Sequence, residues 1–155
     1  MLDRPDGWWA APPKFPDASG ALVSTVDDLY AFASMLAADG RTGDGGRLLS
    51  AASVRQMTRD RMTAAERAES RIFVGDHSGW GLMMLVPAEG AGNTADNSKI
   101  PGGFGWDGGS GTAWRTDTSR GLTGILLTQR MATSPEPIPL VTDFWAAAYA
   151  AIDAA

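Results

Sequence analysis

Cysteine, histidine and lysine are nearly missing from this chain of 155 residues, which has no cysteine at all. Without thiols there can be no disulfide, iron–sulfur cluster, thiolate metal site or cysteine nucleophile. His77 is the single histidine, so a zinc site would take nearly all of its ligands from carboxylates. We therefore expect no metal and no cofactor. Only Lys14 and Lys99 are available for lysine-assisted chemistry.

Excess basic charge, a membrane span and a secretion signal are also missing. The formal net charge of −5 has the wrong sign for a phosphate backbone, so no nucleic acid partner is expected. The longest apolar stretch, Phe144–Ile152, is too short to cross a bilayer, so no membrane partner is expected. Residues Met1–Asp6 lack the charged-then-apolar pattern of a signal peptide, and cytoplasmic is the default expectation.

The residues that are present suit a folded domain with many turns. Hydrophobic residues make up 44% of the chain and charged residues 20%, as in globular proteins. The 19 glycines and 9 prolines exceed average usage and favour tight turns over long helices. We expect one domain with four parts, namely an extended arm (1–20), a helical part (21–60), antiparallel strands (79–130) and a C-terminal helix (140–154).

Capping residues mark the two helices of the helical part. Ser24 or Thr25 can cap the first helix, with acids three residues later, and Gly40 can end it. Ser50 can cap a second helix that runs to about Arg59.

Two further segments flank this helical part. The arm over residues 1–20 is rich in proline and tryptophan, so we expect it to wrap over the domain, with partner recognition as the alternative. A third helix can follow Thr63 if Glu66 closes a capping box.

Short apolar segments in the second half predict strands, and glycine-containing links between the last three predict antiparallel neighbours. The segments are Trp80–Val86, Phe104–Asp107, Thr112–Thr116 and Leu122–Gln129. Residues 88–101 form a long loop of a kind that is often functional or disordered. A last helix over Leu140–Ile152 has one apolar face. An antiparallel sheet with a helix returning onto one face belongs to the α+β class.

Two known motifs are matched only in part. Gly103–Gly108 fits G-x-G-x-x-G, but a β-like segment follows it instead of a helix, so nucleotide binding is not expected. Gly108–Thr112 approaches the G-x-S-x-G nucleophile elbow but ends in threonine, and a triad would need His77 upstream of Ser110. A complete Ser-His-Asp site is therefore not expected. His77 is either a solvated loop residue or part of a site.

The run Trp106-Asp107-Gly108-Gly109 ends a strand in two glycines, whose backbone no side chain shields. An oxyanion-hole donor or a substrate-binding edge strand needs open backbone of this kind. A hairpin with a glycine turn accounts for the same residues, so the pattern alone leaves both interpretations open.

Four segments resemble, in order, the serine β-lactamase-like hydrolases, which include class C β-lactamases, D-alanyl-D-alanine peptidases and family VIII esterases. Gly20–Leu29 resembles the family's Gly-Gly-Leu-x-Ser-Thr-x-x-Asp-Leu segment, and Gly46–Val54 its Gly-x-x-Leu-Leu-Ser-x-x-Ser-Val segment. Gly79–Leu82 resembles its Gly-Tyr-Gly-Leu strand, and Gly103–Gln129 its third-motif region. The resemblance covers residues 15–152 and implies the C-terminal part of the β-lactamase/transpeptidase-like fold.

Two catalytic motifs of that family have no counterpart in this sequence. The nucleophile motif is Ser-x-x-Lys, in which the lysine helps to deprotonate the serine. Lys14 and Lys99 instead stand three residues after Ala11 and Asp96. The Tyr-x-Asn motif is also missing. Both motifs precede the matched region in the family, so the resemblance implies a single partial domain, the C-terminal half of such a hydrolase, inactive alone.

The resemblance also assigns candidate site residues. These are the third-motif position (Trp106, Asp107, Gly108), one oxyanion-hole donor (the N–H of Gly109) and two substrate-binding residues (Ser110, Gly111). Tryptophan in place of the family's lysine removes the cation that would hold a carboxylate, which favours esterase-like acyl transfer over β-lactam hydrolysis. A negative Asp107 would disfavour anionic substrates further if its side chain faced the site. The implied partner of the full-length parent is a small-molecule ester or amide.

The strand over Leu122–Gln129 is expected to be an open edge, because N-terminal strands pair beside it in the family. An apolar edge without charge promotes self-association or pairing with a missing half. Two alternatives stay open. The chain can be a non-catalytic binding or interaction module derived from the same fold, or a hydrolase that uses Ser110 as an unrelated nucleophile.

Overall fold

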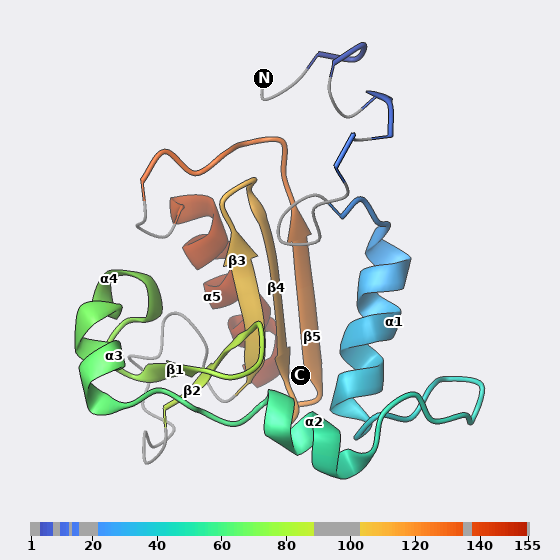
Figure 1. Ribbon diagram of the computed structural model, residues 1–155, viewed down its shortest axis with the longest axis vertical. Helices are drawn as coiled ribbons and strands as arrows, with labels where there is room; N and C mark the ends of the chain where they lie inside the picture. The colour runs from blue at the N-terminus through green and yellow to red at the C-terminus, as the bar shows by residue number, and fades with distance from the viewer. Residues whose placement is uncertain are drawn as a thin grey trace.

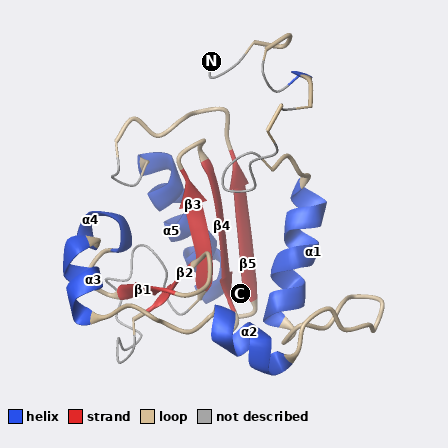
Figure 2. Cartoon of the chain, in the orientation of Figure 1, coloured by secondary structure: helices blue, strands red, loops and turns tan. Residues whose placement is uncertain are grey.

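The computed structural model describes residues 4–7, 10–12, 14–15, 22–88, 103–134 and 138–154 (Figure 1). The helices in this part are α1 (Val26–Ala37), α2 (Ala51–Met57), α3 (Ala64–Glu69), α4 (Arg71–Val74) and α5 (Pro139–Asp153). The strands are β1 (Ser78–Trp80), β2 (Leu85–Pro87), β3 (Phe104–Gly108), β4 (Thr112–Asp117) and β5 (Leu122–Leu127). The strands pair in chain order and each is antiparallel to the next, which confirms the α+β class (Figure 2).

Helices α1 and α5 cover opposite faces of this sheet. Successive side chains of a strand point to opposite faces. In β4, Trp114 belongs to the buried cluster that contains Leu36 of α1, whereas Ala113 belongs to the cluster that contains Trp145 of α5. The central strands are therefore packed on both sides, and we call the two sides the α1 face and the α5 face.

The prediction of one strand over Trp80–Val86 is wrong. The segment splits into β1 and β2, which pair as a hairpin. Its turn packs against the end of α2, because a Cβ at Gly81 would lie 2.0 Å from the carbonyl oxygen of Met57. The same oxygen accepts a hydrogen bond from the amide of Leu82 at 2.8 Å, and Met83 adopts a φ of +64°. The turn thus depends on a contact with a distant helix, which an apolar run does not reveal.

Side-chain caps set the starts of α1 and α2 as predicted. Thr25 is the residue that caps α1, and its hydroxyl accepts from the amide of Asp28 at 3.1 Å. Ser50 caps α2 through the amide of Ser53 at 3.0 Å. Helix α2 ends two residues earlier than predicted.

The later helices differ in how well sequence patterns predicted them. The capping box between Thr63 and Glu66 is present at the start of α3. Helix α4 was not predicted, since it is a single turn of four residues. Helix α5 has the predicted inward face, with Val141 and Trp145 buried.

Two sequence predictions fall mainly on residues outside the described part. Most of the expected arm over 1–20 and nearly all of the expected loop over 88–101 lie there, so both stay predictions. No helix in the described ranges is both long and apolar enough to cross a membrane.

Candidate functional site

The β3–β4 hairpin carries all six candidate site residues, from Trp106 to Gly111. Gly111 closes the turn with a φ of +85°, and a Cβ there would lie 1.9 Å from the carbonyl oxygen of Arg130. Its own carbonyl accepts from the amide of Thr128 at 3.1 Å and from the hydroxyl of Thr128 at 2.7 Å. The chain beyond β5 therefore anchors the turn, and a side chain at position 111 would break this packing.

Gly109 presents exposed backbone at the end of β3. A Cβ added there would meet nothing within 4 Å. The peptide that carries its N–H is held through the carbonyl of Gly108, which accepts from the amide of Gly111 at 3.0 Å. The next peptide is held through the carbonyl of Gly109, which accepts from the amide of Ala132 at 2.9 Å. No backbone carbonyl in the described ranges accepts from the amide of Gly109. A fixed peptide with an unused exposed N–H has the properties that an oxyanion donor needs.

Trp106 and Asp107 project to opposite sides of the sheet. Trp106 pairs with Trp114, whose ring lies on the α1 face. Asp107 lies on the α5 face, where one carboxylate oxygen is 2.5 Å from a guanidinium nitrogen of Arg115. The negative charge of Asp107 is thus compensated, and it lies on the face away from Trp106.

Arg115 is the buried cation of the α5 face. Its side chain is 4% exposed, and its guanidinium carbon lies 4.8 Å from the ring centre of Trp145. Burial lowers the pKa of Arg115 from its usual value, and the charge of Asp107 opposes that shift. An arginine stays protonated under these conditions. The ion pair therefore holds the Asp107 side chain on the α5 face.

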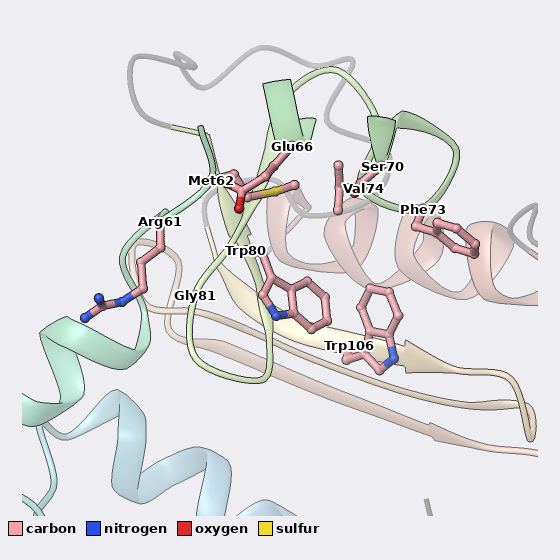
Figure 3. Close-up of a pocket in the computed structure, with 9 residues that line it drawn as sticks. All are labelled: Arg61, Met62, Glu66, Ser70, Phe73, Val74, Trp80, Gly81 and Trp106. Atoms are coloured by element: carbon pink, nitrogen blue, oxygen red, sulfur yellow. The ribbon is translucent and has the colours of Figure 1, made fainter. Parts of the chain in front are cut away.

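A pocket of about 500 Å³ opens beside β3 (Figure 3). Its lining comes from the loop before α3, from α3, α4 and the residue between them, from β1 and the β1–β2 turn, and from β3. The residues are Arg61, Met62, Glu66, Ser70, Phe73, Val74, Trp80, Gly81 and Trp106. The rings of Trp80 and Trp106 meet edge to face, with centroids 4.7 Å apart and planes at 90°. Sequence patterns did not predict this pocket. The two tryptophans are visible in the sequence, but their meeting depends on the β1–β2 turn.

A buried ion pair holds the helical wall of this pocket onto β1. The carboxylate of Asp60 is 5% exposed and accepts from the guanidinium of Arg67 in α3. The same carboxylate accepts from the amides of Met62 at 3.0 Å and Trp80 at 3.3 Å. Arg67 also donates to the carbonyl of Ser78. Several hydrogen bonds to each charge offset its desolvation, so the wall is firmly placed.

Comparison with known proteins decides the family. A model of the family described as Beta-lactamase matches residues 2–142, which is most of the chain. This chain belongs to the beta-lactamase family. The match supports a fold of the serine hydrolase type for this chain.

Two curated relatives of this beta-lactamase family member come from Mycobacterium tuberculosis. They are Protein Rv1367c of strain ATCC 25618 / H37Rv and Uncharacterized protein MT1414 of strain CDC 1551 / Oshkosh. Each is 40% identical over 127 residues, a match that covers 76% of this chain and 30% of the relative. The matched part of the chain thus spans less than a third of the length of these relatives.

The structure does not join Ser110 and His77 into a catalytic pair. Ser110 is exposed in the β3–β4 turn, and His77 is exposed just before β1. The described residues contain no hydrogen bond between their side chains, and the backbone carbonyl of His77 accepts from the amide of Ala88 at 3.0 Å. The described ranges also hold no cluster of three residues that could bind a metal ion.

Proposed function

We propose that this chain is the C-terminal portion of a serine hydrolase of the beta-lactamase family, whose full-length parent carries out esterase-like acyl hydrolysis. The exposed, anchored backbone of Gly109 at the end of β3 carries the proposal. The sequence has no Ser-x-x-Lys and no Tyr-x-Asn, so we infer that the chain is inactive alone. The match to the relatives covers only 30% of their length, which supports the inference.

The chemistry assigned to this chain is stabilisation of the oxyanion. When a serine attacks an ester carbonyl, negative charge develops on the carbonyl oxygen, and two backbone N–H groups can bind it. Gly109 supplies one of them in this proposal, and the nucleophile of the parent supplies the other. Loss of a single donor of this kind lowers kcat by about 10²–10³.

The residue types around Gly109 favour a neutral ester over an anionic β-lactam or peptide. Trp106 occupies the position at which the family carries a lysine, so no ammonium group is present there to bind a carboxylate. Arg115 does not replace that lysine, since it is buried on the α5 face and paired with Asp107. The preferred substrate is therefore a small ester or amide without a carboxylate.

Exposed apolar side chains near β5 support the view that this chain normally meets another part of the protein. Val26 and Tyr30 of α1 are 46% and 57% exposed, and Leu127 of β5 is 51% exposed. Strand β5 is an end strand of the sheet and contains no charged residue. In this proposal the β5 edge pairs with the remainder of the parent, and in the isolated chain it promotes self-association.

A non-catalytic binding module is the second candidate function. The observation that favours it is the pocket walled by Trp80 and Trp106, which does not require a nucleophile. Saturable binding of an ester without turnover would be its signature.

A chimera tests the proposed catalytic role. This chain would replace the matched segment of Protein Rv1367c, and hydrolysis of p-nitrophenyl butyrate would be followed. We expect hydrolysis, reduced about 10²–10³-fold by Gly109→Pro, which removes the N–H. The matched variant Ser110→Ala should retain kcat within about twofold, because Ser110 is assigned to substrate binding and not to the chemical step. A chimera that hydrolyses no ester, or one that loses activity with Ser110→Ala alone, would contradict the proposal.

A further inference from the structure

We propose that the pocket between α3, α4 and β3 binds an uncharged, planar aromatic group of a small molecule. The assignment of this aromatic group to the substrate rests on the proposed function. The binding of the group to the pocket does not depend on it. Nothing in the family match assigns a ligand to this pocket.

The size and lining of the pocket suit a flat apolar group. Its volume of about 500 Å³ falls within the range of small-molecule sites, which are mostly apolar with a few polar groups. Its apolar wall consists of Val74, which is buried, and of Trp80 and Met62, which are partly buried. Trp106 is 37% exposed, so part of its ring remains accessible from the pocket.

The charged residues that line the pocket are engaged elsewhere. Arg61 donates to the side chain of Gln56 at 2.6 Å and to its carbonyl at 3.2 Å, and Figure 3 shows its head turned away from the tryptophans. The carboxylate of Glu66 accepts from the amide and the hydroxyl of Thr63, both at 2.8 Å. These hydrogen bonds lower the pKa of Glu66 and keep it ionised.

An anionic ligand is therefore disfavoured. A carboxylate placed against the tryptophans would lose its hydration and would be repelled by Glu66, while the guanidinium of Arg61 is turned away and bound to Gln56.

A cationic ligand is disfavoured by the geometry of the two tryptophans. Aromatic cages bind ammonium groups between the faces of several rings. Here the edge of one indole already covers the face of the other, with planes at 90° and centroids 4.7 Å apart. The pair therefore forms a corner, against which a flat group can lie, and it does not form a cage.

The position of the corner connects it to the catalytic proposal. Trp106 precedes Gly109 by three residues along β3, which corresponds to about 10 Å in an extended strand. An ester whose carbonyl binds at Gly109 thus needs a substituent that spans most of this distance to place an aromatic group against Trp106. The pocket would then select between substrates by the group that it receives.

Fluorine NMR on this chain labelled with 5-fluorotryptophan tests the inference. The probe is 2-acetylnaphthalene, a neutral and non-hydrolysable ketone, and Trp80→Phe and Trp106→Phe assign the two signals. We expect saturable shifts of both signals, while the signal of Trp145, buried on the α5 face, stays unchanged. The anion 2-naphthoate and the cation benzyltrimethylammonium should bind at least tenfold more weakly. Unshifted signals, or tighter binding of either ion, would overturn the inference.

The variant Trp106→Lys supplies a second readout, because position 106 is partly exposed and tolerates a longer polar side chain. We expect it to weaken binding of the ketone at least tenfold and to strengthen binding of 2-naphthoate. An unchanged preference would contradict the assigned contact. The outcomes separate the two proposals: ketone binding in a chain that also hydrolyses esters would refute only the inactive-fragment proposal. Absent binding in an inactive chain would refute only this inference.

Discussion

At the scale of single residues, the absence of a side chain at Gly124 allows α5 to pack closely against the sheet. A Cβ at this position of β5 would lie 2.2 Å from a ring carbon of Trp145, whose side chain is buried. The indole therefore occupies the space that any other residue would fill. The helix can approach the sheet this closely only because the strand carries no side chain there.

Gly124→Ala should therefore destabilise the fold by overpacking. We expect a loss of about 1–3 kcal/mol in the free energy of unfolding, measured by urea denaturation. The control is Gly43→Ala, since a Cβ at Gly43 meets nothing within 4 Å. Equal stability of the two variants would contradict the packing described here.

The environment of Tyr149 makes the stability of the fold depend on pH. Its hydroxyl donates to the buried carboxylate of Asp117 at 3.1 Å, and burial together with this carboxylate raises the pKa of Tyr149. The folded state keeps a proton that the unfolded chain releases near pH 10. The stabilisation is thus complete below about pH 10 and is lost as the pH rises further.

We expect the free energy of unfolding to fall more steeply above about pH 10 in the natural chain than in Tyr149→Phe. Urea titrations from about pH 8 to pH 11 measure the two slopes. Identical slopes would show that Tyr149 does not titrate differently in the two states.

At the scale of elements, α1 depends on the cap at its first turn. Sequence patterns left Ser24 and Thr25 as alternative caps, and the structure assigns the role to Thr25. Thr25→Ala should cost about 1 kcal/mol of unfolding free energy, because the amide of Asp28 loses its acceptor. Ser24→Ala is the matched control and should change stability by less than half as much. Thermal or urea unfolding that ranks the two variants in the reverse order would refute this assignment.

Elements set by local chemistry were predictable, and elements set by distant contacts were not. The caps at Thr25, Ser50 and Thr63 act within three residues, so their helices were placed correctly from sequence. The β1–β2 turn depends on Met57 of α2, and an apolar run contains no sign of that contact.

In the candidate site, too, features set by local sequence were predictable and features set by distant contacts were not. Gly109 and Trp106 were identified from a local strand and turn pattern combined with a family resemblance. The orientation of Asp107 toward Arg115 follows from strand alternation, but the pairing partner depends on the β3–β4 register. The pocket required the packing of α3 and α4 beside β3, which no sequence pattern encoded.

At the scale of the whole molecule, the sheet ends in an uncharged strand, β5, beside exposed apolar residues of α1. An end strand without charge invites pairing with another chain. We expect the isolated chain to sediment as a species larger than a monomer at micromolar concentration. Leu127→Lys should shift it toward the monomer, whereas Leu48→Lys, at a position 68% exposed outside the sheet, should not. A monodisperse monomer of the natural chain would contradict this proposal.

The central claim is that the chain carries one half of a serine hydrolase site and no nucleophile of its own. Intact-mass spectrometry after treatment with a fluorophosphonate probe tests it most directly. We predict no added mass on this chain, and one added probe on the active chimera with Protein Rv1367c. Labelling of the chain alone, particularly if Ser110→Ala abolishes it, would show a nucleophile within these 155 residues and contradict the account.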